Sequence, residues 1–324
     1  MRRLPTFVNT IVAKEEEIRA YWMVETLDSM SALGARYTVP ASMTPGNPLL
    51  PCSDSLWAFP EITMRENQIR PYHYCSAFSL CAIMASTELS RVHEFLLRPV
   101  DMKDYEQRDL WQTEAQHIDE RLTNWRDEFV AAVFRLINAE FTHQDRPEMD
   151  PYIVLTNAVL NTAVITLFQQ RAPCPAGIQQ EVDAWTFASN RCVYAAENTA
   201  FKVRQMEEEE LLVCHPHLIF SIFVAARFYL VHFKAMDANV PSYLHSMAFA
   251  LHVCGKRWVL ARRYEKIIRV AVAEYRTPIA TSTVPKAFFD LRLTTLEISR
   301  ALMAWIDNVG EDMPMADGSL AALT

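Results

Sequence analysis

The chain has 324 residues, of which 51% are hydrophobic and 22% charged, and its formal charge is −8. This composition is ample for a globular core, whereas the negative charge argues against broad contact with nucleic-acid phosphates, which requires a basic surface. The sequence has only six glycines, and alternation of apolar and polar residues is nearly absent, which disfavours a sheet-rich fold. We therefore predict an all-α fold, an irregular multi-helix array in a single domain, with no direct nucleic-acid contact by this chain.

The cysteines and the apolar segments indicate the compartment. An odd number of scattered cysteines without a C-x-x-C pair fits a reducing interior and supports neither a zinc ribbon nor a thioredoxin-like site. The first ten residues, MRRLPTFVNT, lack the apolar core of a secretory signal. The most apolar run, 218–233, contains Arg227 and His232 and is too short and too charged for a membrane span. We expect an intracellular protein without a membrane segment; its cysteines are Cys52, Cys75, Cys81, Cys174, Cys192, Cys214 and Cys254.

The first predicted helix covers residues 16–36, EEIRAYWMVETLDSMSALGAR. Apolar side chains such as Trp22, Val24 and Leu33 wrap well over half of this helix, which predicts that it is buried inside a helical array. In such surroundings Asp28 must be paired or hydrogen-bonded. Gly34, just after the last apolar position, is typical of a helix C-terminus.

Proline-rich residues 37–60 predict an extended connection, after which helical periodicity dominates. Asp150 followed by Pro151 is a favourable helix start, as is Pro216, while Gly255 is a weak point within its helix. The segment after Asn308 has little to bury, so we predict one domain over residues 1–308 and a flexible tail over 309–324. The further helices are expected over 72–97, 105–142, 151–170, 178–206, 217–233, 243–276 and 286–306.

Several short motifs occur in a recognisable order. They are Arg19, Tyr21-Trp22, Asp28, Ser31 and Gly34, then Leu50-Pro51-Cys52-Ser53-Asp54 and Trp57, and later Leu122 with Trp125, Cys192 to Ala196, Phe220 to Ala226, and Trp258 with Ala261. In this order they resemble the middle homology region of fungal binuclear-zinc-cluster transcription factors. The zinc cluster itself, with its six cysteines and basic linker, is not in this chain.

The resemblance implies a regulatory, effector-responsive domain of a fungal transcription regulator, located in the nucleus. Its partner would be a small-molecule effector or another protein, with a homodimer also compatible. The competing hypothesis is a stand-alone enzyme or metabolite-binding protein of secondary metabolism, cytoplasmic, acting on an apolar small molecule without metal or nucleotide. A deep enclosed cavity with converging polar groups would favour that hypothesis, and a packed interior with a large apolar surface patch would favour partner binding.

Arg227 is the most informative single residue, because it lies within a strongly apolar predicted helix. A buried guanidinium requires a carboxylate, carbonyl groups or a ligand anion. We predict that Asp28 is its partner in a structural ion pair. The alternative is an interior pocket, with Trp22, Asp28, Arg227 and Trp258 as candidate lining residues, that holds a small acidic or polyketide-like metabolite.

The sequence gives little indication of catalysis or of a cofactor. No G-x-S-x-G is present and glycine-rich phosphate loops are lacking, so the catalytic residues are unknown and no cofactor is expected. The strongest metal candidate is Cys214-His215-Pro216-His217, whose thiol and imidazole groups suit zinc. Because no second half with ligand spacing follows, we favour the interpretation that this segment is simply a helix start.

Overall fold

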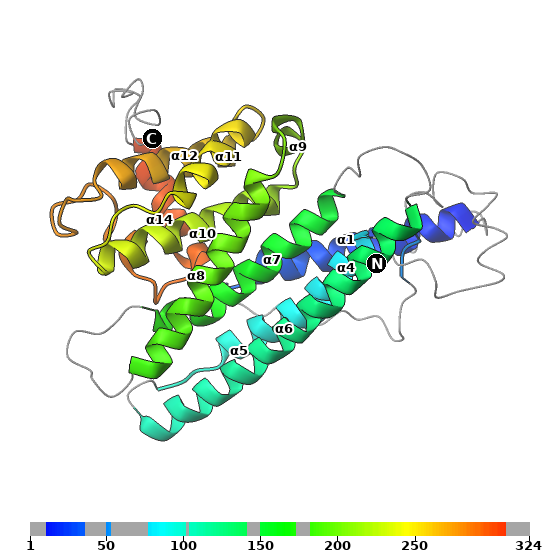
Figure 1. Cartoon of the computed structure of the whole chain (residues 1–324), viewed down its shortest axis with the longest axis horizontal. Coiled ribbons are helices and arrows are strands. Elements are labelled where there is room, and N and C mark those ends of the chain that lie inside the picture. The colour runs from blue at the N-terminus through cyan, green and yellow to red at the C-terminus, as the bar shows by residue number, and fades with distance from the viewer. Residues whose placement is uncertain are drawn as a thin grey trace, which may run out of the picture.

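The computed structural model describes residues 11–35, 50–52, 77–101, 104–140, 150–172 and 182–308. Within these ranges every regular element is a helix, which confirms the all-α prediction (Figure 1). Trp57 and the predicted tail 309–324 lie outside the described residues. The elements are α1 (Ile11–Ala32), α4 (Ala77–Met84), the π-helix η1 (Ala85–Leu89), α5 (Ser90–Leu97), α6 (Tyr105–Glu140), α7 (Pro151–Phe168), the 3₁₀ helix η2 (Gln169–Arg171), α8 (Val182–Arg204), α9 (Glu208–Leu212), α10 (Pro216–Ala235), α11 (Tyr243–Gly255), α12 (Val259–Ala273), α13 (Lys286–Phe289) and α14 (Thr295–Asn308).

Two apolar helices, α7 and α10, form the centre of the array. They pack against each other and against α8, while α4 covers α7 and both α11 and α12 cover α10. Each is long and apolar enough to cross a membrane by composition, yet about four-fifths of each apolar window is buried inside the protein. Both starts follow the predicted capping: the Asp150 carboxylate accepts the Tyr152 N–H at 2.7 Å, and Pro151 and Pro216 occupy the first turns.

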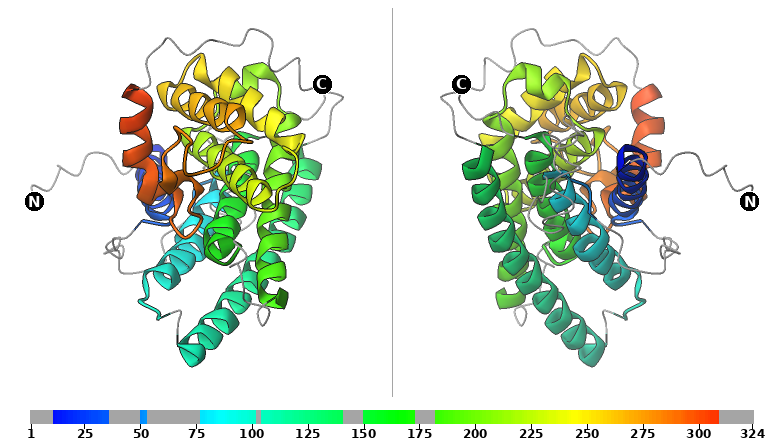
Figure 2. Two further views of the ribbon diagram at one scale, coloured as in Figure 1. Left: turned by 90° about the vertical axis from the view of Figure 1, so that its left-hand side faces the viewer. Right: turned by 90° about the vertical axis from the view of Figure 1, so that its right-hand side faces the viewer.

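Helix α1 lies at the edge of the array rather than inside it (Figure 2). Trp22 and Leu33 are buried on the side facing α4 and η1, but Val24 and Asp28 are exposed. The prediction of a helix buried all round is therefore wrong, because neighbouring helices cover one side of α1 only. Its C-terminus is as predicted: Gly34 has φ +80°, and its carbonyl accepts the Thr294 hydroxyl at 2.6 Å.

Two long predicted helices are each split in the structure. The segment 243–276 forms α11 and α12, which meet at a corner so tight that a Cβ on Gly255 would lie 2.8 Å from Arg262 Cγ. The segment 286–306 forms α13 and α14. Thr294 begins the second of these with a capping box, in which its N–H donates to the Glu297 carboxylate at 2.7 Å. At both breaks, backbone groups find hydrogen-bond partners nearby. Helical periodicity in the sequence does not reveal such breaks.

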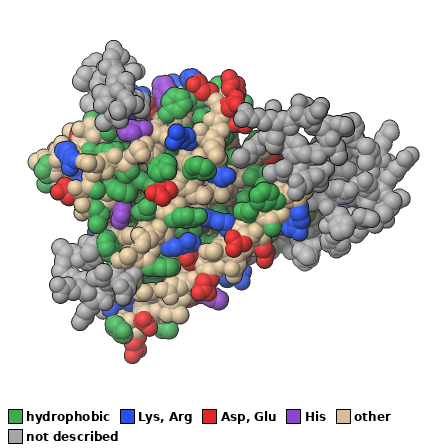
Figure 3. Space-filling view, viewed as in Figure 1, with side chains coloured by type: hydrophobic (Ala, Val, Ile, Leu, Met, Phe, Trp, Pro, Cys, Tyr) green, Lys and Arg blue, Asp and Glu red, His purple; other side chains and the backbone are tan. Residues whose placement is uncertain are grey.

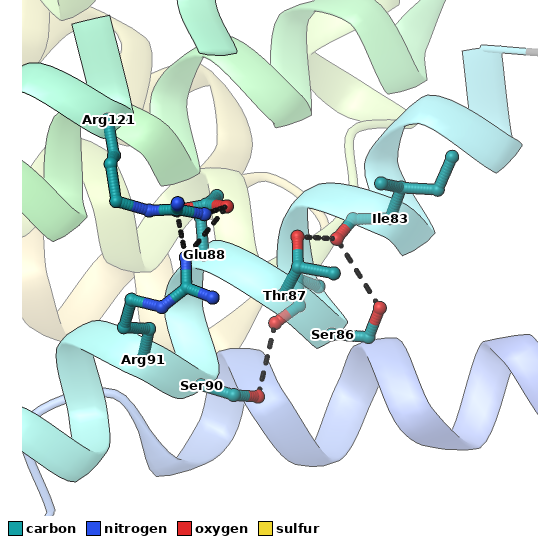
Figure 4. A network of polar contacts seen from close by, with 8 residues as sticks. Ile83, Ser86, Thr87, Glu88, Ser90, Arg91 and Arg121 are labelled. Carbon is teal, nitrogen blue, oxygen red and sulfur yellow. Dashed lines mark hydrogen bonds and ion pairs between the residues drawn. The ribbon is translucent and has the colours of Figure 1, made fainter. Parts of the chain in front are cut away.

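The position of α6 is fixed by a buried carboxylate on the π-helix. Glu88 accepts hydrogen bonds from Arg91 at 3.2 Å and from Arg121 of α6 at 3.0 Å (Figure 4). In the same segment the Thr87 hydroxyl donates to the Ile83 carbonyl at 2.7 Å, which compensates for the irregular ladder. The wider turn of η1 thus presents Glu88 to two arginines and anchors the long helix α6.

Candidate functional site

Arg227 is bound by backbone carbonyls, not by Asp28. Its guanidinium is fully buried and donates to the carbonyls of Phe288 at 3.0 Å, Leu293 at 3.0 Å and Asp290 at 2.7 Å. Weaker bonds to the Ala287 carbonyl and the Thr295 hydroxyl bring the acceptors to five, one for each N–H. The predicted ion pair with Asp28 is therefore wrong, and backbone carbonyls satisfy the buried guanidinium instead.

The environment of Arg227 explains its charge state. Burial lowers its pKa to about 10, against the opposing influence of Asp290 and Glu297, so the group stays cationic at neutral pH. The carbonyls that it binds lie in and just after α13, at the negative end of that short helix. Arg227 is accordingly a structural clamp that joins α10 to the segment between α13 and α14.

The other predicted pocket residues do not gather around Arg227. Trp22 packs with Phe78 in a small cluster of its own, whereas Trp258 precedes α12 and packs against the main core. Asp28 is exposed. Whether any of the four candidates binds a ligand stays a prediction, but Trp22, Asp28 and Trp258 lie in different surroundings from one another.

The Cys214–His217 segment forms a helix start, which is the interpretation that the sequence favoured. The helix α10 begins at Pro216, and the His215 ring accepts the His217 N–H at 3.2 Å and stacks on the His217 ring. Cys214 faces Cys254 instead of the histidines, with 3.6 Å between the sulfur atoms. Among the described residues no group of three or more potential ligands is placed to hold a metal ion.

We expect the stability of the protein to fall on acidification because of His217. Burial, assisted by His215, lowers the His217 pKa from 6.5 to about 4. Between these values the unfolded chain binds more protons than the folded one, so the free energy of unfolding decreases as pH falls through this window. His217→Gln should remove on the order of 1 kcal/mol of that loss. Urea unfolding at several pH values between 7 and 4.5 is the measurement, and an unchanged dependence on pH in His217→Gln would contradict this expectation.

A hollow of about 520 Å³ opens to solvent between α6 and α8. The ion pair of Asp119 with Arg191, at 2.6 Å, spans it, and Arg191 also donates to the Thr123 hydroxyl at 3.2 Å. Burial raises the Asp119 pKa, although the arginine opposes this effect. The Asp119–Arg191 pair is neutral overall, so the additional carboxylate of Glu120 gives the hollow a net negative charge. Its lining residues are Gln116, Asp119, Glu120, Thr123, Asn124, Phe187 and Arg191.

A polar network beneath the hollow sets the spacing of α6, α7 and α8. Asn161 of α7 is fully buried and accepts a hydrogen bond from Arg126 of α6 at 2.6 Å. Its amide nitrogen donates to Asn157 and to Asn198 of α8, both at 3.0 Å. Arg126 also lies over the Tyr194 ring. One amide thus bonds to three side chains from three helices and links α6 and α8 to α7.

Exposed aromatic side chains continue from the hollow along α8. Phe187, Tyr194 and Phe201 are seven residues apart, so they form one stripe on the helix, here called the aromatic stripe. Their exposures are 37%, 52% and 49%. On α6, Val130 is also exposed and lies seven residues after the lining residue Thr123, and Phe134 is exposed four residues further along the helix. The hollow, the aromatic stripe, Val130 and Phe134 together form what we call the α6–α8 groove.

The arrangement of α6 and α8 can be followed in the figures. Figure 1 shows α6 and α8 running in the same general direction and splaying apart over α7. Figure 3 shows this face with hydrophobic side chains exposed among charged ones. Sequence reasoning missed the aromatic stripe because it followed only the inward positions of this helix, such as Cys192 and Ala196. The seven-residue aromatic spacing on the opposite side was the available signal.

Comparison with known proteins finds a curated relative that is similar over most of the chain. Over 302 residues, 92% of the chain, the sequence is 39% identical to the notoamide biosynthesis cluster transcriptional coactivator notQ′ of Aspergillus versicolor. The chain is similar to a fungal transcriptional coactivator. This relative confirms the predicted resemblance to a fungal transcription regulator. The chain spans about half of the relative's length, 49%.

Other comparisons add no further relatives. No family model matches the chain, and no solved structure matches it. The narrower placement in the middle homology region of zinc-cluster factors accordingly stays a prediction. The motif residues nevertheless meet in space: Arg19 donates to the Cys52 carbonyl at 2.8 Å, and the Cys52 N–H donates to Glu15 at 2.8 Å. Cys52, within the described residues 50–52, is thereby held against α1.

Proposed function

We propose that the chain is the partner-binding region of a fungal transcription regulator, and that the α6–α8 groove is where the partner docks. The observation that carries this proposal is the aromatic stripe, since aligned exposed aromatics beside a hollow are typical of protein interaction sites. The similarity to a transcriptional coactivator supports the regulatory part. On the same basis we propose that this regulator acts in the nucleus on a biosynthesis gene cluster.

The chemistry of the groove favours an amphipathic helix as the partner element. The stripe presents aromatic rings along one wall at a spacing that matches apolar residues at i, i+3, i+4 and i+7 of a docked helix. The other wall carries exposed acids, Glu120 and Asp127, on the same face of α6. A helix with an apolar face flanked by lysine or arginine would satisfy both walls.

The interior supports partner binding over a buried small-molecule site. Arg227, the strongest interior candidate for an anion, has its N–H groups occupied by main-chain acceptors. The hollow at the groove is open to solvent rather than enclosed. A small-molecule effector would therefore act at the surface, whereas the exposed aromatic rings would gain from burial by a protein.

A synthetic amphipathic helix of about 20 residues, with a leucine face and lysine flanks, provides the test. Fluorescence anisotropy should detect its binding, and Tyr194→Ser with Phe201→Ser should weaken it at least tenfold, or about 1.4 kcal/mol. Thermal stability should fall only modestly, because both rings are about half exposed and the Tyr194 change removes one ring contact with Arg126. Tyr105→Ser, an exposed aromatic change at the start of α6, is the matched control and should leave affinity unchanged.

A second peptide with glutamate in place of lysine tests the charge of the groove. It should bind more weakly than the lysine peptide, and Glu120→Gln with Asp127→Asn should narrow the difference. Equal binding of both peptides by the wild type would contradict the proposed basic partner. Self-association that the Tyr194 and Phe201 changes abolish would instead make a second copy of the chain the occupant.

A further inference from the structure

Two buried cysteines from different elements meet near the surface turn that follows α9. Cys214 lies in the turn between α9 and α10, and Cys254 lies near the end of α11. Their sulfur atoms are 3.6 Å apart, and the Cys254 thiol also lies 3.3 Å from the Leu211 carbonyl. Such a separation is a van der Waals contact, so a covalent bond of about 2 Å would need only a small movement of the turn.

The two thiols differ in reactivity. The hydrogen bond from Cys254, followed by the charge of Arg257, lowers the pKa of Cys214 against the effect of burial. The same hydrogen bond and burial raise the pKa of Cys254. The pKa values of Cys81 and Cys192 are also raised, mainly by burial. Cys214 is therefore the thiol most readily ionised within this set, and the thiolate is the nucleophilic form.

Access also favours Cys214 over the cysteines of the core. Val213, its neighbour in the turn, is 64% exposed, and His215 on the other side is partly exposed. Cys192, by contrast, is inside the buried face of α8 and faces the Ile165 carbonyl. A small oxidant can thus reach Cys214 by a local opening of the turn, whereas reaching Cys192 requires separation of α7 and α8.

We propose that Cys214 and Cys254 form a reversible disulfide when the protein meets a hydroperoxide. The Cys214 thiolate attacks one peroxide oxygen, the O–O bond breaks, and the leaving hydroxide takes a proton to become water. The resulting sulfenic acid is attacked by the Cys254 sulfur, which loses its proton as the second water departs. Two thiols and one hydrogen peroxide give one disulfide and two waters, and a dithiol reductant reverses the change.

The disulfide would join the α9–α10 turn to α11 and so restrain the elements that follow α8. This inference is independent of the proposed partner groove, because it concerns the chemistry of the two sulfur atoms alone. It identifies a modification site in a protein that is otherwise expected to keep its thiols reduced. The bond would form only under oxidising conditions.

Peptide mapping of the purified full chain tests the proposal. After brief treatment with hydrogen peroxide and alkylation of the remaining thiols, digestion without reductant should yield a linked pair of peptides carrying Cys214 and Cys254. Its mass should equal the sum of the two peptides less two hydrogens, and dithiothreitol should abolish it. Cys81 and Cys192 should be recovered as alkylated thiols. The proposal would be overturned if no linked pair forms and Cys81 or Cys192 is oxidised as fast as Cys214.

Variants separate the two steps. In Cys254→Ser the sulfenic acid on Cys214 should persist and be trapped by dimedone, whereas Cys214→Ser should abolish both trapping at this turn and the linked peptide. Cys192→Ser is the control and should retain the link. Because the map of the wild-type protein requires no substitution, the result stands even if a serine variant folds poorly. Dimedone labelling of Cys214 without any link in the wild type would contradict the disulfide.

Discussion

Replacement of Arg227 with methionine should lower the free energy of unfolding by about 3–5 kcal/mol. Methionine fills a similar volume but donates no hydrogen bond, so the carbonyls of Phe288, Asp290 and Leu293 would lose the donor that the structure gives them. Buried carbonyls without a donor are costly, and several would be created at once. The link between α10 and the α13–α14 segment would loosen accordingly.

Urea unfolding followed by circular dichroism gives the measurement for Arg227→Met. Arg292→Met is the matched control, because the Arg292 side chain is 77% exposed and pairs with the nearby Asp290 carboxylate. An exposed pair of this kind contributes less than about 1 kcal/mol. If Arg227→Met left stability unchanged but removed binding of a small anion, the clamp would be wrong and an interior ligand site right.

Replacement of Asn161 with leucine should cost about 2–4 kcal/mol, because it removes the centre of the network between α6, α7 and α8. The Oδ1 atom of Asn161 accepts from Arg126, and its Nδ2 atom donates to Asn157 and Asn198. Leucine is close in volume, so the loss would come from polar groups rather than from a cavity. Burial already lowers the Arg126 pKa, which makes the loss of its acceptor more costly.

A double-mutant cycle distinguishes this cause from a packing defect. Arg126→Met combined with Asn161→Leu should be less destabilising than the sum of the single changes, since removing the cation removes the group left without Asn161. The coupling should be on the order of 1 kcal/mol in urea unfolding. Strict additivity would instead indicate that leucine is a poor fit at this position and that the hydrogen bonds contribute little.

Much of the fold was predictable because its signals are local. The periodicity of 105–142 predicted α6, and the pairs Asp150-Pro151 and His215-Pro216 mark the first turns of α7 and α10. The predominantly apolar character of α10 also predicted that it lies in the centre. Helix starts are governed by capping groups within a few residues, which a sequence displays directly.

The candidate site was less predictable because it depends on which surfaces remain uncovered. The aromatic stripe and the central network require α6 and α8 to flank α7, and Asp119 meets Arg191 across 72 positions in the sequence. The partners of Arg227 were likewise hidden, because it binds carbonyls about sixty residues away. Amphipathic periodicity gives the apolar side of a helix but not its neighbours.

The sequence by itself determined that the chain is all-α, where α7 and α10 begin, and that a charge within α10 must be satisfied. Only the tertiary structure decided how, with Arg227 bound by carbonyls rather than by Asp28, which α1 leaves in solvent. The physical reason is the distance along the chain over which each interaction acts. Capping and periodicity act over one or two turns, whereas the partner of a buried guanidinium and the exposure of a helix face depend on packing between distant segments.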